Sequence, residues 1–419
     1  MVADANDGLA EADADLAANV DHSVGSPLEV LSAFLRLGLT CFGGPIAHIG
    51  YFREEFVVRR RWLDEQAYAD LVGLCQFLPG PASSQVGFSI GLLRAGYLGA
   101  LAAWTGFTLP SACALVAFAY AATELGGPFG TGLIHGLKLV AVAIVAQAVW
   151  GMARTLCPDR ERASIATVAT LIVLLSTSAA MQIAAIAIGG AAGYWLCRKG
   201  AAPSLTGHLS VPFSHRTGAA MLAVFALILV GLPLLRLVLP WTGLALFEAF
   251  YRSGALVFGG GHVVLPLLRE AFVTPGWVSD NAFLAGYGAA QAIPGPLFTF
   301  AAYLGAVVGP SPHSLAGAAL GLVGLFLPGL LVVLGALPFW DALRKQQPAQ
   351  AVMRGVNAAV VGLLGAAFYN PVWTGAVHAP ADMAVALIGF VLLVVWRAPP
   401  VVVVGIGALA GVGTALIVR

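Results

Sequence analysis

The sequence predicts an all-α integral membrane protein with two inverted-topology repeats that contain broken or re-entrant helix hairpins. Of its 419 residues, 59% are hydrophobic and 10% are charged, and the mean hydropathy is +0.89. Soluble domains carry about 25% charged residues, so this composition indicates a chain that lies mostly in lipid. Within the apolar stretches, a block rich in glycine and proline occurs twice. Paired interrupted segments at matching positions in two halves are typical of secondary transporters.

The duplicated block keeps its residues in register over a long stretch. The first copy contains Phe34, Arg36, Gly38, Phe42-Gly43-Gly44-Pro45, Glu54, Trp62, Gln76 and Pro79-Gly80-Pro81. The second copy contains Phe250, Arg252, Gly254, Phe258-Gly259-Gly260-Gly261, Glu270, Trp277, Gln291 and Pro294-Gly295-Pro296. The offset is 216 residues up to the glutamates and 215 from the tryptophans onward. Later positions, such as Pro110 and Pro328, also correspond, which indicates that a whole half of the chain is duplicated.

Composition divides the chain into four segments. Residues 1–27 are acidic and lack Lys and Arg, which predicts a disordered tail and no cleaved signal peptide. Residues 28–200 form the first membrane repeat, and residues 242–419 form the second. Residues 201–241 are a linker that includes one additional transmembrane helix.

Nine apolar segments are long enough to cross the membrane as helices. They are residues 97–123, 132–153, 163–177, 179–197, 217–239, 314–339, 351–370, 381–397 and 399–418. Four further segments are broken near their middle by glycine or proline, namely 28–50, 67–93, 242–265 and 282–308. An arm of about 10 residues covers only ~15 Å, half of the hydrocarbon core, so each broken segment can turn back as a hairpin.

The distribution of Lys and Arg distinguishes nine spanning helices with four hairpins from thirteen spanning helices. With hairpins, fifteen basic residues are cytoplasmic and three are outside, when Arg36, Lys138 and Arg252 are left out. With thirteen spans the count is twelve to six, and the cluster Arg59–Arg61 lies outside. The positive-inside rule therefore favours hairpins and a cytoplasmic N-terminus. In both arrangements an odd number of crossings separates the two copies, so the repeats must be inverted.

The helix breaks predict a binding site for an oxyanion. A helix that begins inside the membrane presents unpaired backbone N–H groups and about half a positive charge. Pro45, Pro81 and Pro296 suit a first helical turn, where the missing N–H of proline costs nothing. Four such breaks in two registered copies favour an anion-binding nest over simple helix kinks. Hydroxyl donors follow the breaks at Ser83, Ser84 and Thr299.

Arg36 and Arg252 occupy the same position in the two copies. A buried arginine costs at least about 2.5 kcal/mol in a spanning helix, so it usually faces a cavity or a partner. A pair of guanidinium groups suits an anion with two charges or several oxygens. The alternative is that each arginine reaches the membrane interface or pairs with Glu54 or Glu270.

Three further charged residues are candidates for coupling to a driving ion. Glu54 and Glu270 are equivalent in the two copies, and each also adjoins a basic residue with which it can form a plain salt bridge. Lys138 is an intramembrane cation whose counterpart is Asn357, so the two halves differ at this position.

Two histidines and two glutamines lie close to the breaks in sequence. His48 and His262 follow the glycines and suit either a proton relay or polar packing, while Gln76 and Gln291 precede the Pro-Gly-Pro turns and can donate amide hydrogen bonds. The complete set of predicted substrate-binding residues is Arg36, Gly43, Gly44, Pro45, His48, Gln76, Pro79, Gly80, Ser83, Ser84, Arg252, Gly259, Gly260, His262, Gln291, Pro294, Gly295 and Thr299.

The blocks Phe42–His48 with Gln76–Pro81, and Phe258–His262 with Gln291–Pro296, resemble the chromate ion transporter family. The resemblance covers nearly the whole chain and both repeats, as in the long, two-domain members. It implies an inner-membrane protein that exports chromate, confers chromate resistance and is driven by the membrane potential or a proton gradient. It also implies competition by sulfate. Gly261 stands where the first copy has a proline, so the second motif is only partly kept.

Other classes of protein find less support in the sequence. A net charge of +1 argues against a nucleic-acid partner, and five scattered cysteines lack metal-ligand spacing. A membrane-embedded enzyme remains an alternative, but it would need a nucleotide-binding loop or a catalytic set that we do not find. We therefore expect no cofactor and no metal. The expected partners are chromate or sulfate, the lipid bilayer and, as an open alternative, a second copy in a homodimer.

Overall fold

The computed structural model describes residues 25–417 apart from 43, 125–126, 176–178, 199–213, 240, 259–260, 309–313 and 344–345. Helices are the only regular elements among these residues, which confirms the predicted all-α class. Almost all of the predicted acidic tail lies outside the described residues, so its disorder stays a prediction.

The first repeat contains helices α2 to α8. Their bounds are α2 Pro27–Thr40, α3 Gly44–Arg53 with a π-helical extension Glu54–Arg59, α4 Glu65–Phe77, α5 Ala82–Glu124, α6 Gly127–Leu156, α7 Arg160–Leu175 and α8 Ala179–Leu196. The additional helix of the linker is α9, His215–Val238. Most of its residues are exposed in the isolated chain and the helix is strongly apolar, as expected for a helix in contact with lipid.

The second repeat repeats this order. Its helices are α10 Thr242–Ala255, α11 Val264–Phe272 after a 3₁₀ turn Gly261–Val263, α12 Asp280–Ala292, α13 Phe300–Val307 after a 3₁₀ turn Leu297–Thr299, α14 Leu315–Ala336, α15 Trp340–Leu343 after a 3₁₀ turn Leu337–Phe339, α16 Gln347–Ala367 with a π-helical extension Phe368–Trp373, α17 Pro380–Val394 and α18 Pro400–Ile417. Each of the nine predicted spanning segments coincides with a helix. Helices α5, α6, α9, α14 and α16 are long and apolar enough to cross a membrane.

The four broken segments of the sequence are helical hairpins in the structure. Their arms are α2 with α3, α4 with the first part of α5, α10 with α11, and α12 with α13. Helix α5 is not one straight rod, because Ala95 and Gly96 leave the helical conformation and Gly96 has a φ of +63°. The chain reverses there, so that Gly91 packs directly on Gly99. Residues 82–94 are thus the returning arm of the second hairpin, and the helix that follows is a separate span.

Ion pairs at the hairpin ends show that both hairpins of the first repeat start and finish at one face. The Gly25 N–H donates to the Arg94 carbonyl at 3.0 Å, and the Arg94 guanidinium lies 3.4 Å from Glu29. The Arg53 side chain, at the end of the first hairpin, contacts Glu65, at the start of the second, at 2.7 Å. These contacts support the hairpin arrangement over thirteen crossings.

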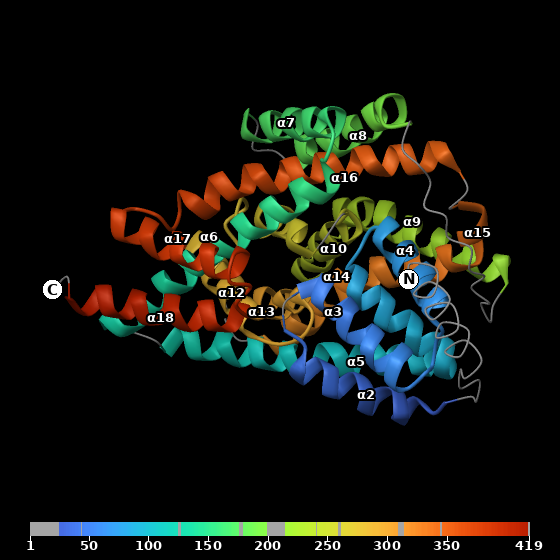
Figure 1. Cartoon of the computed structure of the whole chain (residues 1–419), viewed down its shortest axis with the longest axis horizontal. Helices are drawn as coiled ribbons and strands as arrows, with labels where there is room; N and C mark the ends of the chain where they lie inside the picture. The colour runs from blue at the N-terminus through green and yellow to red at the C-terminus, as the bar shows by residue number, and fades with distance from the viewer. Residues whose placement is uncertain are drawn as a thin grey trace, which may run out of the picture.

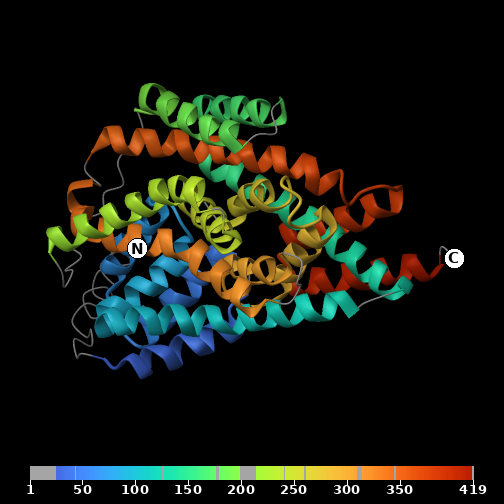
Figure 2. The same ribbon diagram turned by 180° about the vertical axis from the view of Figure 1, so that it is seen from behind.

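The last two helices of each repeat pack on the other repeat. Helices α7 and α8 lie along α16, and α17 and α18 lie against α6 (Figure 1). Glycines permit these close approaches at equivalent places: a Cβ on Gly136 would collide with the Gly407 carbonyl, and one on Gly355 with the Gly189 carbonyl. Figure 2 shows from behind that the hairpin helices of the second repeat are enclosed between α16 on one side and α5 on the other.

The topology can be tested by cysteine labelling in a chain whose native cysteines are replaced. Arg61→Cys, in the exposed connection between the first two hairpins, should react with an impermeant maleimide only from the cytoplasmic side. Pro275→Cys, in the equivalent exposed connection of the second repeat, should react only from outside, because the repeats are inverted. Labelling of both positions from the same side would contradict the inverted arrangement.

Candidate functional site

The four helix breaks meet at the centre of the protein. The Gly80 N–H, in the second break, donates to the Val257 carbonyl, at the third, at 2.7 Å. The Gly295 N–H, in the fourth break, donates to the Cys41 carbonyl, at the first, at 2.9 Å. We call the region around Cys41, Gly80, Val257 and Gly295 the junction. Because Gly80 corresponds to Gly295 and Cys41 to Val257, the two hydrogen bonds are the same contact made in both directions.

Close packing at the junction follows the same twofold relation. A Cβ on Gly80 would lie 2.8 Å from the Gly329 Cα, and a Cβ on Gly295 would lie 2.8 Å from the Ser111 Oγ. Both glycines also have positive φ, +121° and +104°, which other residues rarely adopt. A Cβ on Gly261 would lie 3.1 Å from its own counterpart, Pro45. The repeats are therefore related by an approximate twofold axis through the junction.

In the first repeat, polar side chains surround the breaks. The Nδ1 of His48 lies 3.3 Å from the Ser83 Oγ, and both side chains are buried. The Gln85 amide donates to the Pro79 carbonyl at 2.9 Å and to the Gly329 carbonyl at 2.8 Å. Gln85 therefore fastens the second break to α14 of the other repeat.

The second repeat has different polar groups around its breaks. The Nδ1 of His262 lies 2.6 Å from the Tyr287 hydroxyl, whereas His48 faces a serine. The Thr299 hydroxyl donates to the Pro296 carbonyl at 2.7 Å. The backbone is thus nearly symmetric around the junction, but its hydrogen-bonding side chains are not.

Several buried polar atoms near the junction have no partner among the described residues. They are His48 Nε2, Ser84 Oγ, Gln85 Oε1 and Gln291 Nε2. An unsatisfied buried polar group costs about 1–3 kcal/mol, so native proteins usually pair such groups with water, an ion or a ligand. His48 and Ser84 are only 1% and 3% exposed, so bulk water does not reach them in this conformation. These two groups can donate hydrogen bonds to a small polar guest.

The two predicted arginines do not line up with these groups. Arg36 is exposed on the outer face of α2, beside Leu35 and Leu39. Arg252 contacts Glu248 at 2.7 Å, and Glu248, which is buried, also contacts Arg236 at 2.7 Å. Arg252 thus belongs to an ion-pair network, although not with the expected Glu270. A role for the two arginines in binding stays a prediction.

The predicted coupling residues are spread over several places. Glu54 is exposed, and Glu270 accepts a hydrogen bond from the Thr274 hydroxyl at 3.0 Å. The expected salt bridges of these glutamates with their basic neighbours are absent among the described residues, because Arg53 pairs with Glu65 and Arg269 with Asp280.

Lys138 is buried and makes a contact between the repeats. Its ammonium group donates to the Asn281 side-chain oxygen at 2.6 Å. The equivalent of Lys138, Asn357, has a buried side-chain oxygen without a partner in the described part of the chain. Lys138 therefore joins α6 to α12, and its part in coupling stays a prediction.

The remaining predicted residues fall into four groups. Pro79, Gly80, Ser83, Ser84, Pro294, Gly295 and Thr299 lie at or directly after the breaks. Gly44 and Pro45 begin α3, and a Cβ on Gly44 would meet open space. Gln76 is exposed, while Gln291 is partly buried. Gly43, Gly259 and Gly260 lie outside the described residues.

Four residues of this region were missed by the candidate set derived from the sequence. Tyr287 and Glu248 interrupt otherwise apolar helical faces, which is a usable signal for a polar contact. Gln85 follows the helix-breaking Pro81 by four residues, and Ser111 directly follows Pro110 inside α5, so a polar side chain beside a membrane proline is a usable signal at both positions. Gln85 contacts Gly329 and Ser111 lies against Gly295, both more than 180 residues away in sequence. Only the fold identifies these two partners.

Two helical repeats whose hairpins meet at a buried, partly unsatisfied polar centre are an arrangement typical of membrane transporters. The chain belongs to the chromate transporter family, whose model matches residues 28–194 and 244–412. The two matches correspond to the two repeats described above.

Curated relatives are similar over most of their length. The chain is 28% identical to the chromate transport protein of Pseudomonas aeruginosa over 88% of this chain and 87% of that protein. It is 28% identical to the probable chromate transport protein of Synechococcus elongatus, over 93% and 96% respectively. It is 25% identical to the chromate transport protein of Cupriavidus metallidurans, over 90% of each. No solved structure matches the chain significantly.

Proposed function

We propose that this protein is a secondary transporter that exports chromate across the inner membrane and thereby confers chromate resistance. The family and the names of its relatives support chromate as the substrate. Chromate is a tetrahedral dianion, so it can accept hydrogen bonds on four oxygens from donors that surround it.

The observation that carries this proposal is the pair of unpartnered donors at the junction. His48 Nε2 and Ser84 Oγ are buried on two different hairpins of the first repeat. Helix α3 begins at Gly44, four residues before His48, and α5 begins at Ala82, two residues before Ser84. The positive ends of two helices thus lie beside the two donors, as suits an oxyanion. Neutral donors and helix ends can replace the anion's water shell without a fixed opposite charge that would hold it too tightly.

The symmetry of the junction suggests how access alternates. In one conformation, one repeat closes the site toward its side of the membrane while the other repeat leaves the site open toward the opposite side. Because the repeats are inverted, exchanging their two conformations would open the site to the other side. The two reciprocal hydrogen bonds, Gly80 to Val257 and Gly295 to Cys41, then act as equivalent contacts on the two sides of the axis.

Two other functions compete with chromate export. Sulfate has the same shape and charge as chromate, and the same donors would bind it. A membrane-embedded enzyme is the alternative of another class; the relatives are named as transport proteins, which favours transport.

The test is uptake of radiolabelled chromate into proteoliposomes that contain only this protein, with inside-out and right-side-out orientations separated by the labelling sites above. We expect saturable uptake that follows an imposed potential or pH gradient, with sulfate as a weaker competitor. Saturable uptake of sulfate that chromate fails to inhibit would reassign the substrate. Chemical conversion of chromate without transport would instead favour the enzyme.

A further inference from the structure

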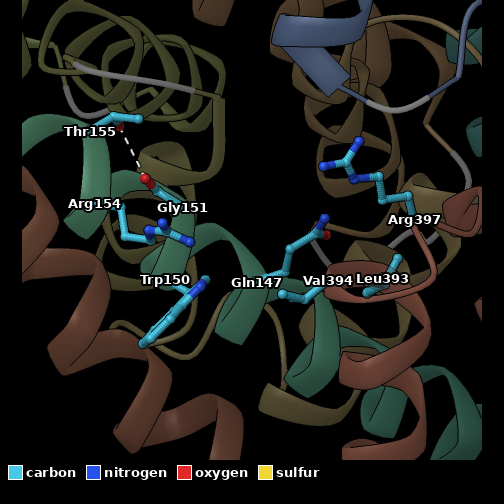
Figure 3. Close-up of a pocket in the computed structure, with 8 residues that line it drawn as sticks. All are labelled: Gln147, Trp150, Gly151, Arg154, Thr155, Leu393, Val394 and Arg397. Atoms are coloured by element: carbon cyan, nitrogen blue, oxygen red, sulfur yellow. Dashed lines mark hydrogen bonds between the residues drawn. The ribbon is translucent and has the colours of Figure 1, made fainter.

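A pocket separate from the junction lies between the C-terminal half of α6 and the end of α17. It has a volume of about 580 Å³ and is lined by Gln147, Trp150, Gly151, Arg154, Thr155, Leu393, Val394 and Arg397. Figure 3 shows Arg154 and Arg397 on opposite sides of the pocket, with the Gln147 amide between them. The walls of this pocket come from both repeats.

The pocket carries two positive charges without a compensating acid. No carboxylate lines it, and neither arginine forms an ion pair with an acidic residue in the described part of the chain. Arg154 stacks loosely on Trp150, with 6.0 Å between the guanidinium carbon and the ring centroid. The Thr155 hydroxyl donates to the Gly151 carbonyl at 3.0 Å, so the donors that face the pocket are the two guanidinium groups, the Gln147 amide and the Trp150 indole N–H.

The backbone at Arg397 strengthens the case. Arg397 has a φ of +53°, and the Ala398 N–H donates to the Leu392 carbonyl at 2.9 Å. This is the left-handed region, which residues other than glycine rarely adopt, and it lies two residues beyond Val395, the C-cap of α17. Arg397 lines the pocket from this position.

Aromatic residues place the pocket at the depth of lipid headgroups. Trp150 and Trp396 are 51% and 75% exposed, and indole rings on the surface of spanning helices concentrate at the membrane interface. Arg154 lies one turn beyond Trp150, and Arg397 follows Trp396 directly. In the hairpin topology both arginines are cytoplasmic. The exposed Val395 beside the pocket can contact an acyl chain.

We propose that this pocket binds a phosphate-type anion, and that in the membrane the phosphate of an acidic phospholipid headgroup occupies it. Basic pockets between transmembrane helices at the cytoplasmic face recognise such headgroups. A lipid held here would bridge α6 of the first repeat and α17 of the second, and so would stabilise the contact between the repeats.

The test compares thermal unfolding of the delipidated, purified protein in detergent with phosphatidylglycerol, phosphatidylcholine or inorganic phosphate added. The variants are Arg154→Gln, Arg397→Gln and the double variant. The matched control is Arg216→Gln, which removes a charge from an exposed position at the start of α9 on the same side. Unfolding without lipid confirms that each variant is folded.

We expect phosphatidylglycerol, but not phosphatidylcholine, to raise the melting temperature of the wild type and the Arg216→Gln control by several degrees. Each single variant should lose a large part of this shift, and the double variant should lose all of it. The same shift in the double variant and in the wild type would overturn the proposal. Protection of the wild type by inorganic phosphate alone, lost in the double variant, would support the anion site and overturn its assignment to lipid.

Discussion

Gly44→Leu is expected to give a folded, inserted protein that does not transport. A Cβ on Gly44 meets no atom of the described residues within 4 Å, so a side chain there extends into space at the start of α3 beside the junction. The φ of +78° adds a backbone cost of roughly 1–2 kcal/mol, which a protein of this size should survive. Proteoliposome uptake should fall by about tenfold or more, the change expected when ~1.4 kcal/mol or more of binding is lost.

Two other glycines provide the comparison. Gly80→Leu should prevent folding, because its Cβ would overlap the Gly329 Cα and the Gln85 amide. Gly50→Leu, on the exposed face of the same helix as Gly44, should be folded and active. Thermal unfolding and uptake together separate the three outcomes. If Gly44→Leu transports like the wild type, the start of α3 does not contact the anion.

Ser84→Ala is expected to weaken anion binding without destabilising the empty protein. The Ser84 hydroxyl is buried and unpartnered among the described residues, so its removal relieves an unsatisfied group rather than breaking a bond. A hydrogen bond to a charged group contributes about 1.5–3 kcal/mol, which corresponds to a loss of affinity of roughly tenfold or more. Unfolding measured with and without chromate or sulfate reports both quantities.

The equivalent residue of the second repeat is the matched control for this experiment. The Thr299 hydroxyl already donates to the Pro296 carbonyl, so Thr299→Val should lower stability and leave anion affinity nearly unchanged. Equal stabilisation of Ser84→Ala and the wild type by the anion would remove Ser84 from the site. A loss of affinity in Thr299→Val alone would move the site to the second repeat.

The hairpins and the inverted repeat could be predicted from the sequence because they depend on local chemistry. Glycine and proline interrupt a helix wherever they occur in sufficient number, and their matching positions in two copies need no knowledge of tertiary contacts. The positive-inside rule then separated returning segments from crossing ones, and the ion pairs at the hairpin ends agree with that choice.

The structure places Arg36 on the exposed face of α2. The buried residues of α2 are Val30, Ala33, Phe34, Leu37 and Gly38, which follow a helical period, and Arg36 falls outside this stripe. The helical period of α2 therefore directs Arg36 outward, which the equivalence of Arg36 and Arg252 in the two copies does not indicate. Glu248 lies four residues before Arg252, one helical turn away, and this spacing is typical of an ion pair on one helix.

The junction itself could not be derived from the sequence. Its hydrogen bonds join Gly80 to Val257 and Gly295 to Cys41, over separations that no local pattern encodes. The same holds for the pocket between Arg154 and Arg397, because nothing in either segment indicates that α17 packs on α6.

The exchange of α7 and α8 onto α16, and of α17 and α18 onto α6, determines which parts of the protein can move as rigid bodies (Figure 1). Glycine-mediated contacts at Gly136 and Gly355 bring these backbones too close for one helix to slide past the other without its neighbour. Each rigid body therefore contains helices from both repeats. If the chain were cut between the two repeats, the fragments would have to re-form the contacts of α7 and α8 with α16 and of α17 and α18 with α6. By the same reasoning, an ancestral protein with a single repeat could have functioned only as an intertwined dimer.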